Sequence, residues 1–234
     1  MKIYGRNVVT SALENKEEIS KIYLQNGFRD NYILSLIEKS NIPVKYLPKD
    51  KMNRMTDSIH QGVIAEVKDY EYEELENVMR ENGFLVILDH LEDPHNFGAI
   101  IRTCEAAGVD GIIIPKNRSV SVNPTVIKVS TGAIDNMKIV AVTNLNQTIE
   151  TLKKNNYWIV ATDMDGEDYT KIDYTGSTAI IIGNEGSGVS DLVLKNSDFI
   201  ASIPMRGTTN SLNASVAAGI VIFEALKCRS KNGL

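Results

Sequence analysis

The sequence IPMRGTTNSLNAS, residues 203–215, is a polar loop that connects two apolar segments. Residues 198–203, before it, have the pattern of a strand, and residues 216–226, after it, have the pattern of a helix. Open α/β sheets bind ligands at the loops that follow the carboxyl ends of buried strands. This stretch therefore predicts an α/β fold with a ligand site beside its last helix.

Two more strand-to-loop junctions of this kind occur earlier in the chain. The apolar run at residues 84–88 leads into DPHNFG at 93–98, and the run at 179–182 leads into GNEGSG at 183–188. Loops at the carboxyl ends of neighbouring parallel strands lie at the same edge of a sheet. We expect the three loops to form one site.

Length and composition are those of a globular protein of one or two domains, with 234 residues and enough apolar side chains for a buried core. No apolar stretch approaches the roughly 20 residues that cross a bilayer, and residues 1–6 begin no signal-peptide core. We expect a cytosolic protein without a membrane partner. Cys104 and Cys228 have no paired metal-ligand spacing, and we expect both to be buried as small apolar residues.

Charge is distributed unevenly along the chain. The net charge is −5, but residues 1–68 hold 8 lysines, 3 arginines and 8 acids, a net charge of +3, and the remainder carries −8. A basic surplus favours a polyanion as partner, although a charged surface often serves only solubility. The front of the chain is therefore the candidate for a module that faces RNA or DNA.

The front segment alternates between helical and strand patterns, which predicts a small layered α/β unit. Helices are expected at 8–13, 32–38 and 51–56, and strands at 21–24, 44–47 and 63–67. Acids and tyrosines follow without an apolar run. We place a first domain at 1–68, a linker at 69–80 and a second domain at 81–234.

The second domain alternates in the same way. Strands are expected at 84–88, 111–114, 138–142, 158–162, 179–182 and 199–203, and helices at 99–107, 123–130, 146–154, 190–194 and 216–226. Runs such as Ile112–Ile114 and Ile180–Ile182 are apolar throughout, which is typical of parallel strands covered on both faces. We predict a mainly parallel sheet.

The glycine-rich loop at residues 183–188 lets the backbone turn sharply and approach a ligand closely. It matches neither the dinucleotide fingerprint nor the phosphate-binding P-loop, and a tight turn without function is the alternative. Glu185 within it could orient a hydroxyl or a guanidinium. The alternative for Glu185 is an acid favoured by the dipole of the following helix.

Asn96 and Arg102 belong to the first loop and the early part of the helix after it. We expect both to face the cleft above the strand ends. A guanidinium matches phosphate oxygens bidentately, and the helix around Arg102 is largely apolar, which makes an ordinary surface position less favoured. His95 receives no role.

Three motifs, in order, resemble those of the SpoU branch of the SPOUT RNA 2′-O-ribose methyltransferases. They are DPHNFGAIIR at 93–102, GNEGSG at 183–188, and IPM through SLNASVA at 203–217. The likeness is greatest to the 23S rRNA (guanosine-2′-O)-methyltransferase group. It covers nearly the whole chain, since YGRNVV at 4–9 and HQGV at 60–63 resemble that family's L30e-like substrate-binding domain.

The resemblance implies a fold, a cofactor and an assembly. The second domain would be an α/β fold whose C-terminal segment threads through a loop as a deep trefoil knot, which the pattern alone would not suggest because knots are rare. S-adenosylmethionine would lie in the knotted loops, and the chain would form a homodimer with sites close to the subunit interface. The implied donor-binding residues are Thr162, Gly183, Ile203, Leu212 and Ser215, with Asn213 beside them.

The resemblance also implies a reaction, 2′-O-methylation of RNA. A ribose hydroxyl is a poor nucleophile at neutral pH, so it needs a proton acceptor and in-line placement. The implied catalytic residues are Asn96, Arg102, Glu185, Ser211 and Asn213. Because a guanidinium is effectively always protonated, we expect Arg102 to bind the phosphate beside the target ribose, with that phosphate or Glu185 assisting proton removal. We expect no metal, since His60, His90 and His95 form no helix-spaced ligand pair.

Other functions stay open at this point. Transfer RNA is the alternative to a guanosine of 23S ribosomal RNA as substrate. A nucleotide-dependent oxidoreductase would need more glycines than the single one in residues 93–98. An RNA-binding protein without catalysis would have no need of the polar residues in the three motifs. For the RNA contacts of the front domain, the basic candidates are Arg6, Arg29 and Lys51.

Overall fold

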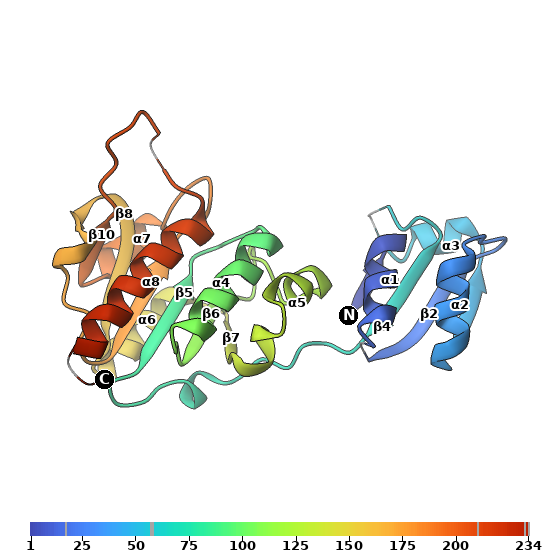
Figure 1. The fold of residues 1–234 in the computed structure, drawn as a ribbon, viewed down its shortest axis with the longest axis horizontal. Coiled ribbons are helices and arrows are strands. Elements are labelled where there is room, and N and C mark those ends of the chain that lie inside the picture. Colours follow the sequence, from blue (N-terminus) through green and yellow to red (C-terminus); the bar gives the residue numbers. More distant parts are fainter. Residues whose placement is uncertain (17, 57–58, 210, 232, 234) are drawn as a thin grey trace. The chain divides into compact units, whose positions relative to one another are not determined.

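A computed structural model describes residues 1–16, 18–56, 59–209, 211–231 and 233, so Asn210 of the 203–215 loop lies outside the described residues. The chain divides into two compact units, Met1–Glu71 and Tyr72–Leu234 (Figure 1). Residues 72–80 of the expected linker belong to the second unit. Val78 is buried there and Leu75 packs against the same core, because this removes their apolar side chains from water.

The front unit is a four-stranded sheet with helices on it. Its elements are β1 (Lys2–Tyr4), α1 (Arg6–Glu14), β2 (Ile19–Gln25), α2 (Asn31–Ser40), β3 (Val44–Leu47), α3 (Lys49–Asn53) and β4 (Val63–Val67). The strand order is β1-β4-β2-β3, with β2 parallel to β3 and β4 antiparallel to both β1 and β2. The expected α/β unit is confirmed, but β1 was not predicted, because it is too short for a clear alternating pattern.

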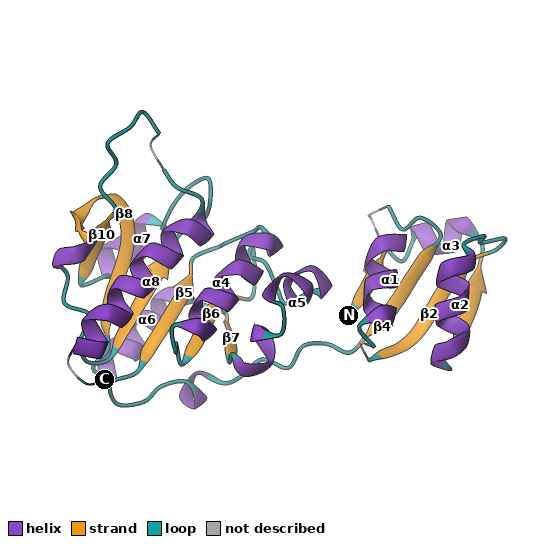
Figure 2. Ribbon diagram, viewed as in Figure 1, coloured by secondary structure: helices purple, strands orange, loops and turns teal. Residues whose placement is uncertain are grey.

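Helices α1 and α2 lie side by side over the sheet of the front unit (Figure 2). Ile33 and Ile37 of α2 are one helical turn apart and point into the same core as Ile22 and Leu24 of β2. The Asp30 side chain accepts a hydrogen bond of 3.2 Å from the amide of Ile33 and so begins α2.

The second unit is built on a six-stranded sheet in which every pairing is parallel, as predicted. Its strands are β5 (Phe84–Leu88), β6 (Gly111–Pro115), β7 (Ile139–Val142), β8 (Trp158–Asp168), β9 (Thr178–Ile182) and β10 (Phe199–Ser202). Its helices are α4 (Pro94–Ala106), α5 (Pro124–Ser130), α6 (Leu145–Lys154), α7 (Asp191–Asn196) and α8 (Ala214–Lys231), with 3₁₀ turns at Leu75–Asn77, Ala133–Asn136 and Tyr169–Lys171. The strand order is β10-β8-β9-β5-β6-β7.

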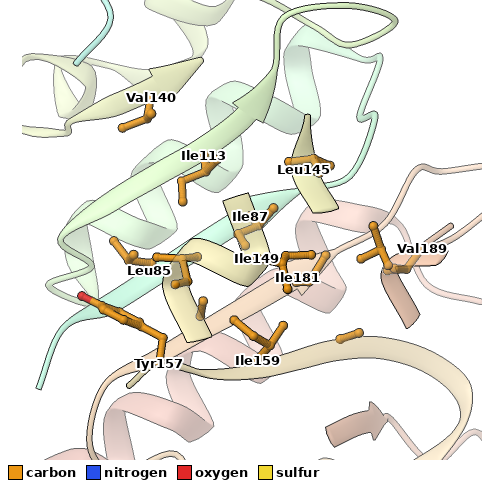
Figure 3. Close-up of a cluster of buried hydrophobic side chains, with 14 of the residues drawn as sticks. Leu85, Ile87, Ile113, Val140, Leu145, Ile149, Tyr157, Ile159, Ile181 and Val189 are labelled. Carbon is orange, nitrogen blue, oxygen red and sulfur yellow. The ribbon is translucent and has the colours of Figure 1, made fainter. Parts of the chain in front are cut away.

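Helices cover both faces of this sheet, with α4 and α8 on one face and α6 and α7 on the other (Figure 2). Figure 3 shows side chains of one core cluster, in which Leu85, Ile87 and Ile181 of the sheet pack with Leu145 and Ile149 of α6. All five residues of β5, of β6 and of β9 are buried. Their uninterrupted apolar sequence reflects burial on both faces.

Two elements differ from their predicted limits in ways that shape the site. Strand β8 was expected to end at Thr162 but continues to Asp168. In its pairing with β10, Ala161 faces Ile200 while Glu167 faces Ala201, so the residues between Ala161 and Glu167 bulge outward. Helix α4 was expected to begin at residue 99 but begins at Pro94, because Asp93 caps it and proline suits a first helical turn.

Helix α8 is anchored at its C-terminal end by Arg229, which is buried and, among the described residues, has only backbone carbonyls as hydrogen-bond partners. The guanidinium donates to the carbonyls of Tyr174 (3.2 Å), Gly176 (2.6 Å) and Asn82, and it lies 5.0 Å from the centre of the Phe84 ring. Burial lowers the pKa of Arg229 from its ordinary value. Threading of this segment through a knot stays a prediction.

The two cysteines differ in burial. Cys104 on α4 is buried, as expected, and burial raises the pKa of its thiol. The expectation for Cys228 is wrong, because it is only half-buried and its sulfur lies 4.0 Å from a carboxylate oxygen of Asp173. Its position near the C-terminal end of α8 places it at the rim of the core.

Candidate functional site

A cavity of about 420 Å³ lies at the carboxyl ends of β9 and β10 and beside the middle of β8. This volume is within the roughly 300–1,000 Å³ of small-molecule sites. The cavity is lined by residues 162–164, 182–188, 201, 203, 211, 212, 214 and 217. Among the predicted donor-binding residues, Thr162, Gly183, Ile203 and Leu212 are on its wall, as is Ser211.

Two of the three predicted loops line this cavity, and the bulge of β8 supplies the third side. The loop after β5, which we also expected there, does not line it. Instead it supplies Asn96, whose side chain contacts the cavity wall at Glu185. Asp163 and Met164 of the bulge were missed, because the polar sequence after Thr162 resembles a surface loop and gives no signal of a strand.

Gly183 occupies a position where no side chain fits. A Cβ atom at this residue would lie 2.3 Å from the carbonyl carbon of Gly188 and 2.4 Å from the amide nitrogen of Val189. Two backbone hydrogen bonds of 3.0 Å between Asn184 and Gly188 close the turn that brings these segments together. The absence of a side chain thus allows the loop to fold back on the end of β9.

A chain of hydrogen bonds connects the three sequence motifs. Asn213 accepts at Oδ1 from the amide and the hydroxyl of Ser215, at 2.9 and 2.6 Å, and donates from Nδ2 to Asn96 Oδ1 at 2.9 Å. Asn96 in turn donates from Nδ2 to Glu185 Oε1 at 2.9 Å. We call Ser215, Asn213, Asn96 and Glu185 the polar chain. All its donors point toward the Glu185 carboxylate, which the aligned dipoles stabilise.

Glu185 is exposed at the rim of the cavity, and its Oε1 accepts a second contact of 3.4 Å from the amide of Asp93. A carboxylate held on one oxygen can accept a proton or a hydroxyl hydrogen bond on the other. Ser215, which we expected to contact the donor, is not on the cavity wall and serves Asn213 instead.

Arg102 lies away from the polar chain. It follows Asn96 by six positions on one continuous helix, which at 3.6 residues per turn is a rotation of about 240°. Its side chain is exposed and lines a separate hollow with Gly132 and Phe223. The expectation that Asn96 and Arg102 face one cleft is therefore wrong within a single chain, and so is the expectation that Arg102 avoids the surface.

The residues that the structure describes contain no group of three or more histidine, cysteine or acidic side chains that could hold a metal ion. His60 in the front unit is buried, with Nε2 2.8 Å from Asn53 Oδ1 and Nδ1 accepting from the amide of Gly62. It is a structural histidine. Across the described ranges, no helix is long and apolar enough to cross a membrane.

Comparison with known families gives two matches that together span most of the chain. The family described as "SpoU rRNA Methylase family" matches residues 83–223. The family described as "RNA 2'-O ribose methyltransferase substrate binding" matches residues 2–73. The boundary between the two matches falls near the division between the two compact units.

Individual relatives agree with these matches. A Staphylococcus saprophyticus protein described as a TrmH family tRNA/rRNA methyltransferase is 44% identical, over 99% of this chain and 97% of its own length. A Bacillus subtilis protein with the same description, YacO, is 39% identical over the same shares. The structure of the SpoU methyltransferase AviRb from Streptomyces viridochromogenes, in complex with the cofactor AdoMet, superposes with a TM-score of 0.67 at 25% identity, over 99% of this chain and 91% of that chain.

Proposed function

Because the chain belongs to the SpoU rRNA methylase family of RNA methyltransferases, we propose that it methylates the ribose 2′-hydroxyl of an RNA with S-adenosylmethionine as donor. The observation that carries the proposal is the polar chain, which ends in a carboxylate at the rim of the cavity. The RNA favoured by the sequence motifs is 23S ribosomal RNA, with a guanosine as target. We also propose that the protein acts in the cytoplasm, where such RNA is made and used.

The cavity suits this donor in size and chemistry. Ile182, Ala201 and Ala217 offer apolar surface for a flat base, and residues 183–188 form part of the wall. Asp163 on the wall has a charge opposite to that of a sulfonium. When bound, S-adenosylmethionine supplies an electrophilic methyl group. The protein's residues then hold that group, orient the hydroxyl that attacks it and exclude water.

The protein's own residues supply a proton acceptor, a cation for the RNA phosphate and the loop beside the donor. Glu185 is held by Asn96 on one oxygen, so its other oxygen can accept the proton of the 2′-hydroxyl. Arg102 is a permanent cation, so it binds a backbone phosphate of the RNA and does not act as a base. Ser211 and Asn213 shape the loop between β10 and α8 that borders the donor.

The surface around Arg102 supports the proposal that the protein assembles as a homodimer. Helix α8 carries apolar side chains around its whole circumference, and Val216 and Phe223 on it are 50% and 47% exposed. Exposed apolar side chains on such a helix are typical of a surface that packs against another protein. Phe223 lines the same hollow as Arg102, so a partner chain on α8 would bring Arg102 to the subunit interface.

The front unit supplies an RNA-binding surface in this proposal. Arg6 lies 5.2 Å from the centre of the Phe28 ring and pairs with Asp30 at 3.4 Å, and Arg29 and Lys51 are exposed. An arginine stacked on an aromatic ring can receive an unpaired base, and the other cations can neutralise phosphates. The family described as substrate binding matches this unit.

Mapping 2′-O-methyl marks on ribosomal and transfer RNA, in cells with and without the gene, tests this proposal. We expect one mark in 23S ribosomal RNA to disappear when the gene is deleted. Loss of a mark in transfer RNA instead would support the alternative substrate, and unchanged marks in both RNAs would support binding without catalysis. The family match removes the support for an oxidoreductase.

A further inference from the structure

Asp89 and His90, directly after β5, connect this strand to the glycine-rich loop after β9. Asp89 is 1% exposed, the most deeply buried acid of the second unit among the described residues, and both of its carboxylate oxygens are engaged. Oδ2 accepts from the amide of Ser190 at 2.8 Å, and Oδ1 lies 2.5 Å from His90 Nδ1. Because the carboxylate accepts, His90 Nδ1 carries the hydrogen.

The backbone of His90 is held in an unusual conformation. Its φ is +56°, in the left-handed region, which is strained for a residue that carries a side chain. Two contacts maintain it: the imidazole bonds to Asp89, and the His90 carbonyl accepts from Asn184 Nδ2 at 2.8 Å. Strain that is held by surrounding contacts in this way is often associated with functional sites.

Asn184 extends the connection into the cavity wall. Its Oδ1 accepts from the amides of Gly186 and Ser187, at 2.8 and 3.2 Å, so one side chain fixes both the turn and its attachment to His90. Glu185, the next residue, takes its position from this turn. The contacts Asp89–Ser190 and His90–Asn184 therefore hold the glycine-rich loop at its C-terminal end and near its start.

We propose that Asp89 and His90 are positioning residues that set the glycine-rich loop, residues 183–188, for donor binding. They touch neither the cavity nor the polar chain, and they act through Ser190 and Asn184. The inference rests on the proposed function, since it concerns the donor cavity. It predicts that the affinity for S-adenosylmethionine depends on a carboxylate that never contacts it.

The test compares Asp89→Ala and Asp89→Asn in the full chain, with the dissociation constant of S-adenosylmethionine measured by calorimetry and the melting temperature measured in parallel. Asp89→Ala should raise the dissociation constant at least tenfold. Asp89→Asn keeps an oxygen for Ser190 and should recover most of that loss. KM for the donor should rise in step, with kcat at saturating donor changed less than threefold.

Asp110→Asn is the matched control. Asp110 also uses its carboxylate at the backbone of β5, accepting from the amide of Phe84 at 2.7 Å, but it lies at the opposite end of that strand. This variant should lower the melting temperature without changing the dissociation constant more than twofold. The inference is overturned if folded Asp89→Ala binds the donor like wild type, or if Asp110→Asn weakens binding as much. Failure of the wild-type protein to bind the donor would instead refute the proposed function.

Discussion

At the scale of single residues, the hydrogen bonds of the polar chain require particular side chains. Asn96 donates to Glu185 and accepts from Asn213, so it needs both an amide hydrogen and an amide oxygen. The positions of all three residues after strands predict that they share one site. Their hydrogen-bond order is not predictable from sequence, because it depends on contacts between residues about 90 and 117 positions apart.

The Asn96→Ala variant removes a hydrogen bond to a charged group, which contributes about 1.5–3 kcal/mol. We expect kcat for methyl transfer to fall by about 10- to 100-fold, because Glu185 loses its orientation. The dissociation constant of S-adenosylmethionine should change less than threefold, because Asn96 is not on the cavity wall. A variant with wild-type kcat would show that the polar chain has no part in catalysis.

The Arg102→Ala variant tests the second catalytic assignment. We expect methyl transfer to be abolished, a loss of at least about 100- to 1000-fold, because the RNA phosphate loses its cation. Folding and donor binding should be retained, since Arg102 is exposed and lies outside the donor cavity. Lys154→Ala on α6 is the control for loss of one exposed charge and should keep full activity. Near-normal transfer by Arg102→Ala would remove Arg102 from the mechanism.

At the scale of elements, the turn after β9 depends on the absence of a side chain at Gly183. Apolar strands followed by glycines predicted this turn, because that pattern is local. The long β8 was not predictable in the same way. Its second half is polar, and only pairing with the distant β10 makes it a strand.

The Gly183→Ala variant should lose donor binding. Its Cβ would meet backbone atoms of Gly188 and Val189, which cannot move aside as a side chain could. Overpacking of this kind costs about 1–3 kcal/mol, so the melting temperature should also fall. Gly186→Ala is the control in the same loop, because the nearest atom to its Cβ would be 3.5 Å away. Equal effects of the two substitutions on calorimetric binding of S-adenosylmethionine would contradict the role given to Gly183.

The start of helix α4 was predicted at residue 99, but the helix begins at Pro94. Asp93 and Pro94 are a cap and a first-turn proline, which together mark a helix start. The polar residues that follow favoured a loop instead. Treating Asn96 and Arg102 as parts of one helix would have predicted that they face different directions.

At the scale of the whole molecule, the division into two units agrees with the uneven charge along the chain. The net charge of +3 lies in residues 1–68, most of the front unit, and the proposed catalytic site lies in the second. Sequence alone predicted both units and the parallel sheet, because strand and helix patterns are strong in each. It predicted dimerisation only through family likeness, since an exposed apolar helix resembles a buried one in its sequence.

The Phe223→Asp variant tests the assembly. We expect the wild-type protein to sediment as a dimer and the variant as a monomer, because the new charge would be buried against the partner. Leu192→Asp on α7 introduces the same charge at a residue that is 57% exposed and should leave the dimer intact. Analytical ultracentrifugation over a range of concentrations distinguishes these outcomes. A monomeric wild-type protein would contradict the homodimer.

The central claim is that the cavity and the polar chain together direct a methyl group to a ribose oxygen. Purified protein incubated with methyl-labelled S-adenosylmethionine and with ribosomal or transfer RNA, followed by digestion to nucleosides and mass spectrometry, tests it directly. We predict label in a 2′-O-methylnucleoside, and none with the Asn96→Ala and Arg102→Ala double variant. Label on a base, or no label in either RNA, would contradict the account.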